Sequence, residues 1–380
     1  MRIAFFYPSW SMRLPVDVDT IWSSGRGLTG SEIAFFMYAI KLSERGHDVT
    51  VFTKVTRPAQ LGKIACRPYE EWASVHHHPW DALCSWMAPE PLLLSQGGAV
   101  RLFNQQVSDF NMCGGGWEPH VDIMAPLSHS HARHLFNMCS IPREKWRVMY
   151  NGVDTSEFRP AQKVPGKMVW ASSHDRGLHW ILEAFPSIKR RVPHAELHIF
   201  YDLDGMNRFS GFPTENMDPA DVELGMRSRY CLEAIRRLSG KGVHVHASVS
   251  RERIRHELAE AEVLAYTCDP VRYTETFGVA VLEAMACGAV PVISTADAFG
   301  ELWGGAAPCV PAPYSSHKAE YADLVVRSMT DKAWREDRVA AGLARSSEFA
   351  WDGLSAVLEQ TLLSAGSAGL QPVRWTADNT

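Results

Sequence analysis

The amino-acid sequence predicts an α/β protein of two doubly wound domains, each a mostly parallel sheet covered by helices. Three observations lead to this prediction. The chain has 380 residues, and one domain usually takes roughly 100 to 200. Strand and helix patterns alternate in two separate series, one from residue 2 and one from about residue 167. A Pro- and Gly-rich stretch without apolar periodicity, residues 151–166, separates them.

The first series opens with an apolar run, Arg2–Tyr7, that is typical of a buried strand. A polar, Gly-rich stretch follows, and from Ser31 apolar residues recur at helical spacing until Gly46 ends the helix. Residues 47–53, HDVTVFT, alternate like the next strand. The first fifty or so residues therefore predict one β-loop-α-β unit.

The second series begins with MVWAS (168–172) as a strand, and an apolar stripe from Leu178 to Phe185 as a helix. Further short strands alternate with helical segments: 195–201, 242–247, 262–266 and 289–294 as strands, and 251–261, 278–287 and 351–363 as helices. We expect domains at 1–160 and 161–348, with 349–380 as a C-terminal helix packing back on the first domain and a loose tail, Ser364–Thr380.

Composition excludes several classes of function. Lys and Arg number 38 against 43 Asp and Glu, with no basic block, so nucleic acid is not an expected partner. The eight cysteines are scattered without a CxxC pair, which favours reduced thiols and a cytoplasmic location. No apolar run is long enough to span a membrane. We therefore expect at most a peripheral contact, on the inner membrane face.

Two loops precede helices at the carboxyl ends of predicted strands, where open α/β sheets bind ligands. The first contains Gly25, Gly27 and Gly30 and is similar to GxGxxG, but it lies about twenty residues beyond its strand. It is either a turn that packs the helix on the sheet, or a place where Gly30 lets a phosphate approach the helix.

The second loop has two carboxylates, Glu275 and Glu283, on either side of an F-G-V turn, Phe277–Val279. A helix from 277 would place them about 12 Å apart along its axis at ~1.5 Å per residue. Glycosidase carboxyl pairs stand roughly 5 to 9.5 Å apart, so that chemistry is disfavoured. We expect the two to hold different parts of one elongated ligand, with the amides of the turn facing a phosphate.

These residues resemble a known family. Glu275-x7-Glu283 in ETFGVAVLEAMACGAVPVIS resembles the E-x7-E motif of the retaining family 4 glycosyltransferases, which have the GT-B fold. NGVDTSEFRP (151–160), GLHWILEAF (177–185) and FAWDGLSAVLEQTL (349–362) are similar to that family's interdomain segment, first donor-domain helix and closing helices. The resemblance implies two Rossmann-like domains with an interdomain cleft, the first binding the acceptor and the second the donor.

The resemblance also implies roles for single residues. Glu275 would contact donor-sugar hydroxyls and, with Arg176 in place of the usual Lys before Gly, form the catalytic pair. Arg176 can bind phosphate bidentately. The other implied donor-binding residues are Gly30 at a phosphate, the Phe277–Gly278–Val279 turn at the diphosphate, and Glu283 at the ribose.

The sequence departs from the family at two places. The second basic position falls on Ser172 or Ser173, which removes a charge from the diphosphate site. In the acceptor domain, Gln105 or Gln106 stands near Asp109 where many relatives have His-Asp, so an amide would replace the imidazole. We assign no general base.

Histidine clusters can indicate a metal site, but His76–His78 are consecutive residues and so point in different directions. His129, His131 and His134 have no cysteine or carboxylate set at ligand spacing, and the family resembled is metal-independent. We expect no metal and no cofactor. Trp22 and Trp117 are in predicted loops where a sugar ring could stack.

The function implied is a retaining glycosyltransferase in polysaccharide or glycoconjugate biosynthesis. It would move a sugar from a nucleoside-diphosphate sugar to a hydroxyl of a saccharide, a lipid-linked acceptor or a small molecule. Two alternatives stay open, since fold does not fix reaction. One is a sugar-nucleotide epimerase or a phosphorylase on the same architecture, and the other is a non-catalytic partner subunit that binds nucleotide.

Overall fold

The structure, a computed structural model, describes residues 1–8, 15–22, 28–95, 97–201, 203–211, 218–246 and 249–375. Gly25 and Gly27 of the first predicted loop lie outside the described residues. The chain forms two compact units. The first contains the described residues up to Gly152 and those from Phe349 on, and the second is Val153–Glu348.

The boundary between the units differs from the predicted position at residue 160. Phe158 is buried, and the guanidinium of Arg251 lies 4.7 Å from the centre of its ring. The amide of Ala161 donates to the carbonyl of Ala259 at 3.4 Å. The stretch interpreted from its Pro and Gly content as a linker therefore already packs on the second unit.

The first unit is built on a seven-stranded sheet with the order β3-β4-β2-β1-β5-β6-β7. All pairs are parallel except β3 with β4. The strands are β1 (Arg2–Phe6), β2 (Asp48–Thr53), β3 (Ala59–Leu61), β4 (Ile64–Pro68), β5 (Ala82–Trp86), β6 (Val100–Asn104) and β7 (Ile123–Ala125). The helices are α1 (Gly30–Glu44), α2 (Trp72–Val75), α3 (Glu90–Leu93), α4 (His129–Phe136) and α13 (Trp351–Leu363).

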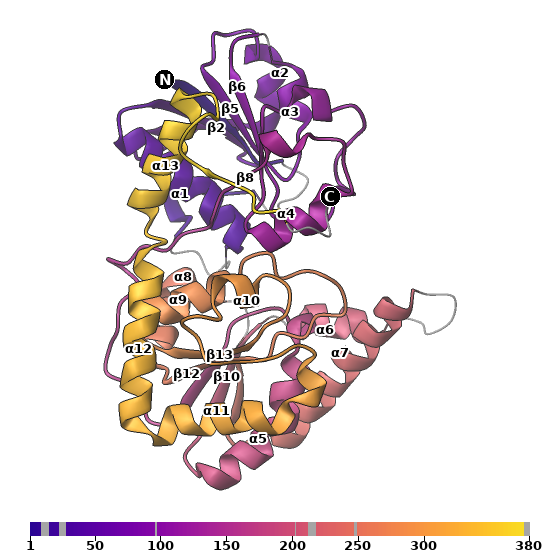
Figure 1. Ribbon diagram of the computed structural model, residues 1–380, viewed down its shortest axis with the longest axis vertical. Coiled ribbons are helices and arrows are strands. Elements are labelled where there is room, and N and C mark those ends of the chain that lie inside the picture. The colour runs from indigo at the N-terminus through magenta and orange to yellow at the C-terminus, as the bar shows by residue number, and fades with distance from the viewer. Residues whose placement is uncertain are drawn as a thin grey trace. The chain divides into compact units, whose positions relative to one another are not determined.

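Alternation along β1 divides the core of this unit into two parts. Ile3 and Phe5 belong to a buried cluster with residues of α1 and α13. Ala4 and Phe6 belong to a second cluster with residues of α2, α3 and α4. Because successive strand residues face opposite sides, the sheet is covered on both faces. Figure 1 shows α13 beside α1.

The C-terminal tail was expected to be loose, and up to residue 375 this is wrong. Strand β15 (Gln371–Pro372) pairs antiparallel with β8 (Arg147–Val148). Val373 is buried, and the Trp375 ring centre lies 4.6 Å from that of Phe136. Apolar side chains at every second position thus anchor this segment, although the preceding residues are small and polar.

The second unit has a parallel sheet with the order β11-β10-β9-β12-β13-β14. The strands are β9 (Lys167–Trp170), β10 (Glu196–Phe200), β11 (Val243–His246), β12 (Val263–Tyr266), β13 (Val290–Ser294) and β14 (Cys309–Val310). The helices are α5 (Leu178–Arg191), α6 (Leu203–Ser210), α7 (Pro219–Leu238), α8 (Arg251–Glu260), α9 (Val279–Ala286), α10 (Phe299–Leu302), α11 (Lys318–Thr330) and α12 (Lys332–Ser347).

Strand order in the second sheet reverses between β9 and β12, which are hydrogen-bonded neighbours. All residues of β9, β12 and β13 are buried, so both faces of these strands are covered. Helix α5 packs on α7 and α11, and α9 packs on α8 and α12 (Figure 1). The reversal makes the carboxyl ends of β9 and β12 the topological switch point.

Among the described residues, no helix has both the length and the apolar character needed to cross a membrane.

Candidate functional site

The loops after β9 and β12 contain the predicted donor-site residues of the second unit. Ser172, Ser173 and Arg176 follow β9, and Glu275 follows β12. Since the two strands are parallel neighbours, their loops leave the sheet side by side at its carboxyl edge. Ligands of doubly wound sheets bind at this place.

Three side chains from these loops and one from the end of β12 form what we call the Glu275 cluster: Ser172, Arg176, Glu275 and Tyr266. Oε1 of Glu275 accepts hydrogen bonds from Nε of Arg176 at 2.7 Å and from the hydroxyl of Tyr266 at 2.5 Å. The hydroxyls of Tyr266 and Ser172 are 2.7 Å apart. Arg176 also donates to Asp175 at 2.5 Å through Nη1.

The cluster combines burial with charge. Burial raises the pKa of the Glu275 carboxyl, and the guanidinium of Arg176 and the Tyr266 hydroxyl oppose this rise. Burial disfavours the charged form of Arg176, but Glu275 and Asp175 outweigh it and raise the guanidinium pKa. The group thus offers a fixed cation beside a carboxylate, the combination that binds a phosphate and an adjacent hydroxyl.

Hydrogen bonds to the backbone hold the two loops that contain Glu275 and Arg176. Asp297 accepts the amides of Thr274 and Glu275 through Oδ2, at 2.8 and 2.9 Å. The amide of Asp269, in the loop after β12, donates to the carbonyl of Arg176, in the loop after β9, at 2.8 Å. Gly177 follows with φ of 113°, and a Cβ there would lie 2.8 Å from Oγ1 of Thr267. The loops are therefore bound to one another.

Helix α9 begins at Val279, one residue after the start of the predicted segment 278–287, and Gly278 is its N-cap. Gly278 has φ of 87°, and a Cβ would lie 2.4 Å from the ring of Phe299, so no larger residue fits. Among the described residues, no side chain caps this N-terminus. Nε1 of Trp303 donates to the carbonyl of Phe277 at 2.8 Å and fixes the turn.

Glu283 lies on α9, is 5% exposed, and forms an ion pair with Arg251. Nη1 of Arg251 donates to Oε1 of Glu283 at 2.7 Å. Arg251 is the first residue of α8 and stacks on Phe158. The buried carboxylate expected from the apolar helix is therefore balanced by a cation that the sequence analysis did not identify.

Ser172 and Ser173 have different neighbours. Ser172 belongs to the Glu275 cluster, whereas Oγ of Ser173 donates to the hydroxyl of Tyr201 at 3.1 Å. In the first unit, Gly30 opens α1, and Thr29 and Glu32 form a capping box around it.

The predicted acceptor-side residues form a buried amide group at the carboxyl end of β6. Gln106 donates to Asn104 at 2.5 Å and exchanges hydrogen bonds with Asn151 at 3.2 and 3.3 Å. Gln105 is 1% exposed and donates to the carbonyl of Asp109. The carboxylate of Asp109 accepts the amide of Asn111 at 2.9 Å. Both glutamine amides are thus engaged within the unit.

The histidines of α4 bind other parts of the first unit. His131 and His134 donate to the carbonyls of Val107 and Ser108 at 3.0 and 2.8 Å, and His129 accepts the amide of Arg374 at 3.0 Å. The expectation for Trp117 was wrong, because its ring is 4% exposed and packs on Phe103 and Phe110.

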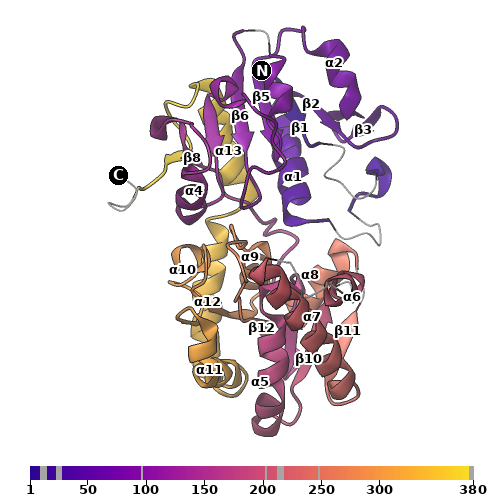
Figure 2. The same ribbon diagram turned by 90° about the vertical axis from the view of Figure 1, so that its right-hand side faces the viewer.

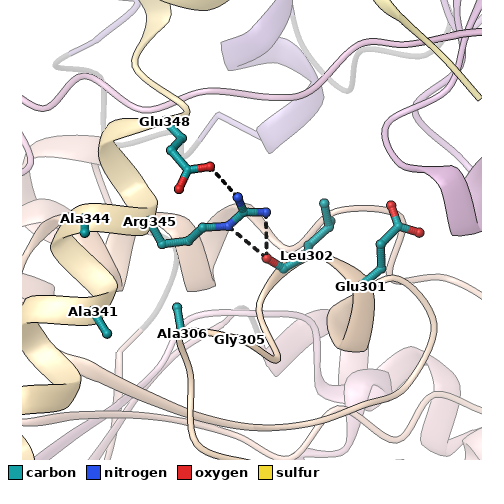
Figure 3. A pocket seen from close by; sticks show the side chains of 8 residues that line it. All are labelled: Glu301, Leu302, Gly305, Ala306, Ala341, Ala344, Arg345 and Glu348. Carbon is teal, nitrogen blue, oxygen red and sulfur yellow. Dashed lines mark hydrogen bonds and ion pairs between the residues drawn. The ribbon is translucent and has the colours of Figure 1, made fainter.

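A hollow of about 330 Å³ opens between α10 and α12, lined by small residues, two carboxylates and one arginine (Figure 3). Arg345 reaches across it, where its Nε and Nη2 donate to the carbonyl of Leu302 at 3.1 and 3.0 Å. None of the cluster residues lines it. Its lining consists of Glu301, Leu302, Gly305, Ala306, Ala341, Ala344, Arg345 and Glu348.

Sequence reasoning missed four residues that complete the site: Tyr266, Asp175, Asp297 and Arg251. Tyr266 looks like the last residue of an apolar strand, and Arg251 like a solvated helix start. A signal existed for Tyr266 only, since strand ends at the carboxyl edge of a parallel sheet face the ligand.

Known proteins resemble this chain in part of its sequence and in its whole fold. The sequence profile of the family described as "Glycosyl transferases group 1" matches residues 168–304. O-antigen chain mannosyltransferase B of Escherichia coli is 33% identical over 84 residues, which are 21% of this chain and 20% of that protein. The match therefore spans about a fifth of this curated relative.

Solved structures agree over almost the full length. Sucrose-phosphate synthase of Thermosynechococcus elongatus superposes with a TM-score of 0.68 at 14% identity, covering 96% of this chain and 98% of that one. HepE of Anabaena, in complex with UDP and glucose, superposes with a TM-score of 0.66 at 14% identity, covering 96% of this chain and 100% of that one. The chain thus has the GT-B fold, and its second unit contains the segment that matches the group 1 glycosyl transferases.

Proposed function

We propose that this protein is a retaining glycosyltransferase of the family 4 type. It transfers a sugar from a nucleoside-diphosphate sugar to a hydroxyl acceptor in polysaccharide or glycoconjugate biosynthesis, without a metal. The observation that supports this most is the Glu275 cluster, which joins a buried carboxylate and an arginine at the switch point of the second sheet. The profile match covers the same region.

In this proposal the donor binds along α9. Arg176 and the amides of Gly278 and Val279 take the diphosphate, because no side chain of the described part of the chain caps the helix N-terminus, which carries a partial positive charge. Glu283, next to Arg251, takes the ribose hydroxyls. Both bonds to Glu275 fall on Oε1, so Oε2 takes the sugar hydroxyls.

The reaction breaks the bond between the anomeric carbon and the phosphate oxygen and forms a bond to the acceptor oxygen on the same face. Charge develops on the leaving diphosphate, where Arg176 and the helix amides stabilise it. The acceptor proton passes to a departing phosphate oxygen. Ser172 or Ser173 in place of a second cation leaves Arg176 as the main counter-charge.

The donor is a nucleoside-diphosphate sugar, a class that includes the UDP-glucose bound in a structure of Anabaena HepE. The acceptor is a saccharide, a lipid-linked saccharide or a small molecule, and the first unit binds it. Gln105, Gln106 and Asp109 remain the candidates for that side. The mannosyltransferase likeness supports mannose among the sugars to be tried.

Donor turnover tests the proposal. The purified protein is incubated in EDTA with UDP-, GDP- and ADP-sugars and a panel of saccharide acceptors, and the product is analysed by proton NMR. We expect nucleoside diphosphate release that depends on the acceptor, with the donor's anomeric configuration kept. Glu275→Gln is expected to lower turnover at least about a hundredfold, the usual loss for one stabilising group in an active site.

The matched control is Glu336→Gln on α12, whose side chain is 66% exposed. It should keep wild-type turnover. An inverted product would refute retention, and a new nucleotide sugar formed without acceptor would indicate an epimerase. Nucleotide binding without turnover of any donor would favour the non-catalytic partner subunit.

A further inference from the structure

Histidines gather on one face of the second sheet at its edge strand. Glu196 and His198 lie on β10, and His244 and His246 lie on β11, which ends the strand order (Figure 2). In the parallel register His198 pairs with His244, and Phe200 pairs with His246. Alternate residues of a strand share a face, so the four polar side chains project from the same side.

Three of them bring ligand atoms together. Oε2 of Glu196 is 3.7 Å from Nε2 of His198 and 3.6 Å from Nε2 of His244. One ligand atom from each residue lies within 4.8 Å of the other two. A tetrahedral zinc ion with bonds of about 2.0 to 2.2 Å holds its ligand atoms roughly 3.4 Å apart. The group is therefore near ligand spacing.

One of these atoms lacks a hydrogen bond. Nε2 of His244 is buried and, among the described residues, has no hydrogen-bond partner. A buried polar atom left in this state costs free energy comparable to a lost hydrogen bond. A metal ion would accept its lone pair.

The fourth residue orients the second histidine. Nδ1 of His198 and Nε2 of His246 are 3.2 Å apart, so one proton lies between them. When Nδ1 of His198 donates this proton, its Nε2 is left with a lone pair on the side of Glu196. Metal-binding histidines commonly donate their other N–H in this way. His246 also stacks on Phe200, with 4.4 Å between ring centres.

The cations near the three ligand residues are already paired with carboxylates, so a metal ion can bind there. Lys167 is the nearest cation on the neighbouring strand, and it is 2.7 Å from both Glu257 and Glu260. Arg253 is also paired with Glu257.

We propose that Glu196, His198 and His244 form a binding site for a divalent transition metal ion, Zn²⁺ in the first place, with His246 orienting His198. Water would complete the coordination, since the Glu196 side chain is 50% exposed. Glu196 is the first residue of β10, at the end of the strand opposite to the switch-point loops. The ion would join the edge strand to its neighbour and take no part in glycosyl transfer.

Metal titration tests this. The full-length protein is stripped with EDTA, dialysed, and titrated with Zn²⁺ against a chromophoric chelator. We expect one equivalent to bind and to raise the midpoint of thermal unfolding. His244→Gln and His198→Gln should each weaken binding at least about tenfold, and His246→Gln about tenfold to a hundredfold, as for partners that orient a ligand.

The control is His77→Gln, a change at an exposed histidine of the run His76–His78 in the first unit, which should leave the affinity unchanged. Failure to bind one equivalent, or equal affinity in His244→Gln, would overturn the proposal. Loss of binding in His77→Gln would do so too, as would a thiolate charge-transfer band on Co²⁺ substitution. The assay contains no donor, so its outcome is independent of the proposed transfer activity.

Discussion

The hydroxyl of Tyr266 donates to Oε1 of Glu275 at 2.5 Å, and that same oxygen takes Nε of Arg176 at 2.7 Å. Tyr266 is the last residue of β12, so the sheet itself fixes the carboxylate. One carboxylate oxygen is thus occupied by the protein. Tyr266 is a positioning residue for Glu275.

Tyr266→Phe keeps the ring that packs edge-on against Phe299 and Trp170 and removes only the hydroxyl. A hydrogen bond to a charged group contributes about 1.5 to 3 kcal/mol. In a domain of this size the midpoint of thermal unfolding should fall by roughly 3 to 12 °C. Differential scanning calorimetry measures this shift.

Tyr314→Phe is the matched control. The Tyr314 hydroxyl is also buried but has no hydrogen-bond partner among the described residues. Removing it should leave the midpoint unchanged or raise it. Equal losses in the two variants would show that the bond to Glu275 contributes nothing specific.

Gly278→Ala should destabilise the second unit. The residue has φ of 87°, and the new Cβ would lie 2.4 Å from the ring of Phe299. Left-handed strain and overpacking each cost on the order of 1 to 3 kcal/mol. We expect a lower unfolding midpoint and displaced α9 amides, seen as weaker nucleotide binding in a fluorescence titration.

Gly353→Ala should change the stability of the protein in the opposite direction to Gly278→Ala. Gly353 is inside α13, and a Cβ there meets no atom within 4 Å. Alanine in a helix is favoured over glycine by roughly 0.5 to 1 kcal/mol, so this variant should be slightly more stable. A midpoint for Gly278→Ala at or above that of Gly353→Ala would contradict the close approach to Phe299.

Acid should destabilise the first unit through His131. This ring is fully buried, and both nitrogens are used: Nε2 donates to the Val107 carbonyl, and Nδ1 accepts the amide of Leu127. Burial lowers its pKa to about 3. Since the unfolded chain takes the proton near pH 6.5, stability falls as pH drops from 6.5 towards 3, by about 1.4 kcal/mol per pH unit for this histidine.

Urea unfolding between pH 7 and pH 4 measures the effect. His131→Asn should be less stable at pH 7, because it loses buried hydrogen bonds, and should lose less stability on acidification than the wild type. Parallel dependences on pH in the two proteins would show that His131 is not the titrating group.

The sequence predicted those parts of the site that depend on short-range pattern. Glu275 and Glu283 were singled out by motif spacing and an apolar helix, and Arg176 by the resemblance of its loop to the family; their roles remain predictions. Tyr266 and Arg251 were not found. Tyr266 is nine residues before Glu275, but its contact with Ser172 depends on the strand order β9-β12. Arg251 meets Glu283 only through the packing of α8 on α9. Trp117 packs on Phe103 and Phe110, although no periodic pattern in the sequence indicates these contacts.

The fold was predictable at the level of strands and layers, because alternation and helical spacing are local signals. The boundary was placed at residue 160 because residues 151–166 are rich in Pro and Gly, but Val153 and Phe158 of this stretch are buried, and Phe158 packs on the distant Arg251. The prediction of a loose tail was wrong because the pairing partner of β15, strand β8, lies more than 200 residues earlier. Contacts between such distant segments leave little trace in composition.

The central claim is that the second unit binds a nucleoside-diphosphate sugar through α9. The most direct measurement is thermal unfolding with UDP, GDP, ADP and their sugar conjugates, one at a time in EDTA, for the wild type and Glu283→Gln. Binding at ~100 times the dissociation constant adds about 2.7 kcal/mol, or several degrees. We predict that one nucleotide raises the wild-type midpoint and that Glu283→Gln loses most of this shift. No shift with any nucleotide, or an undiminished shift in the variant, would contradict the assignment.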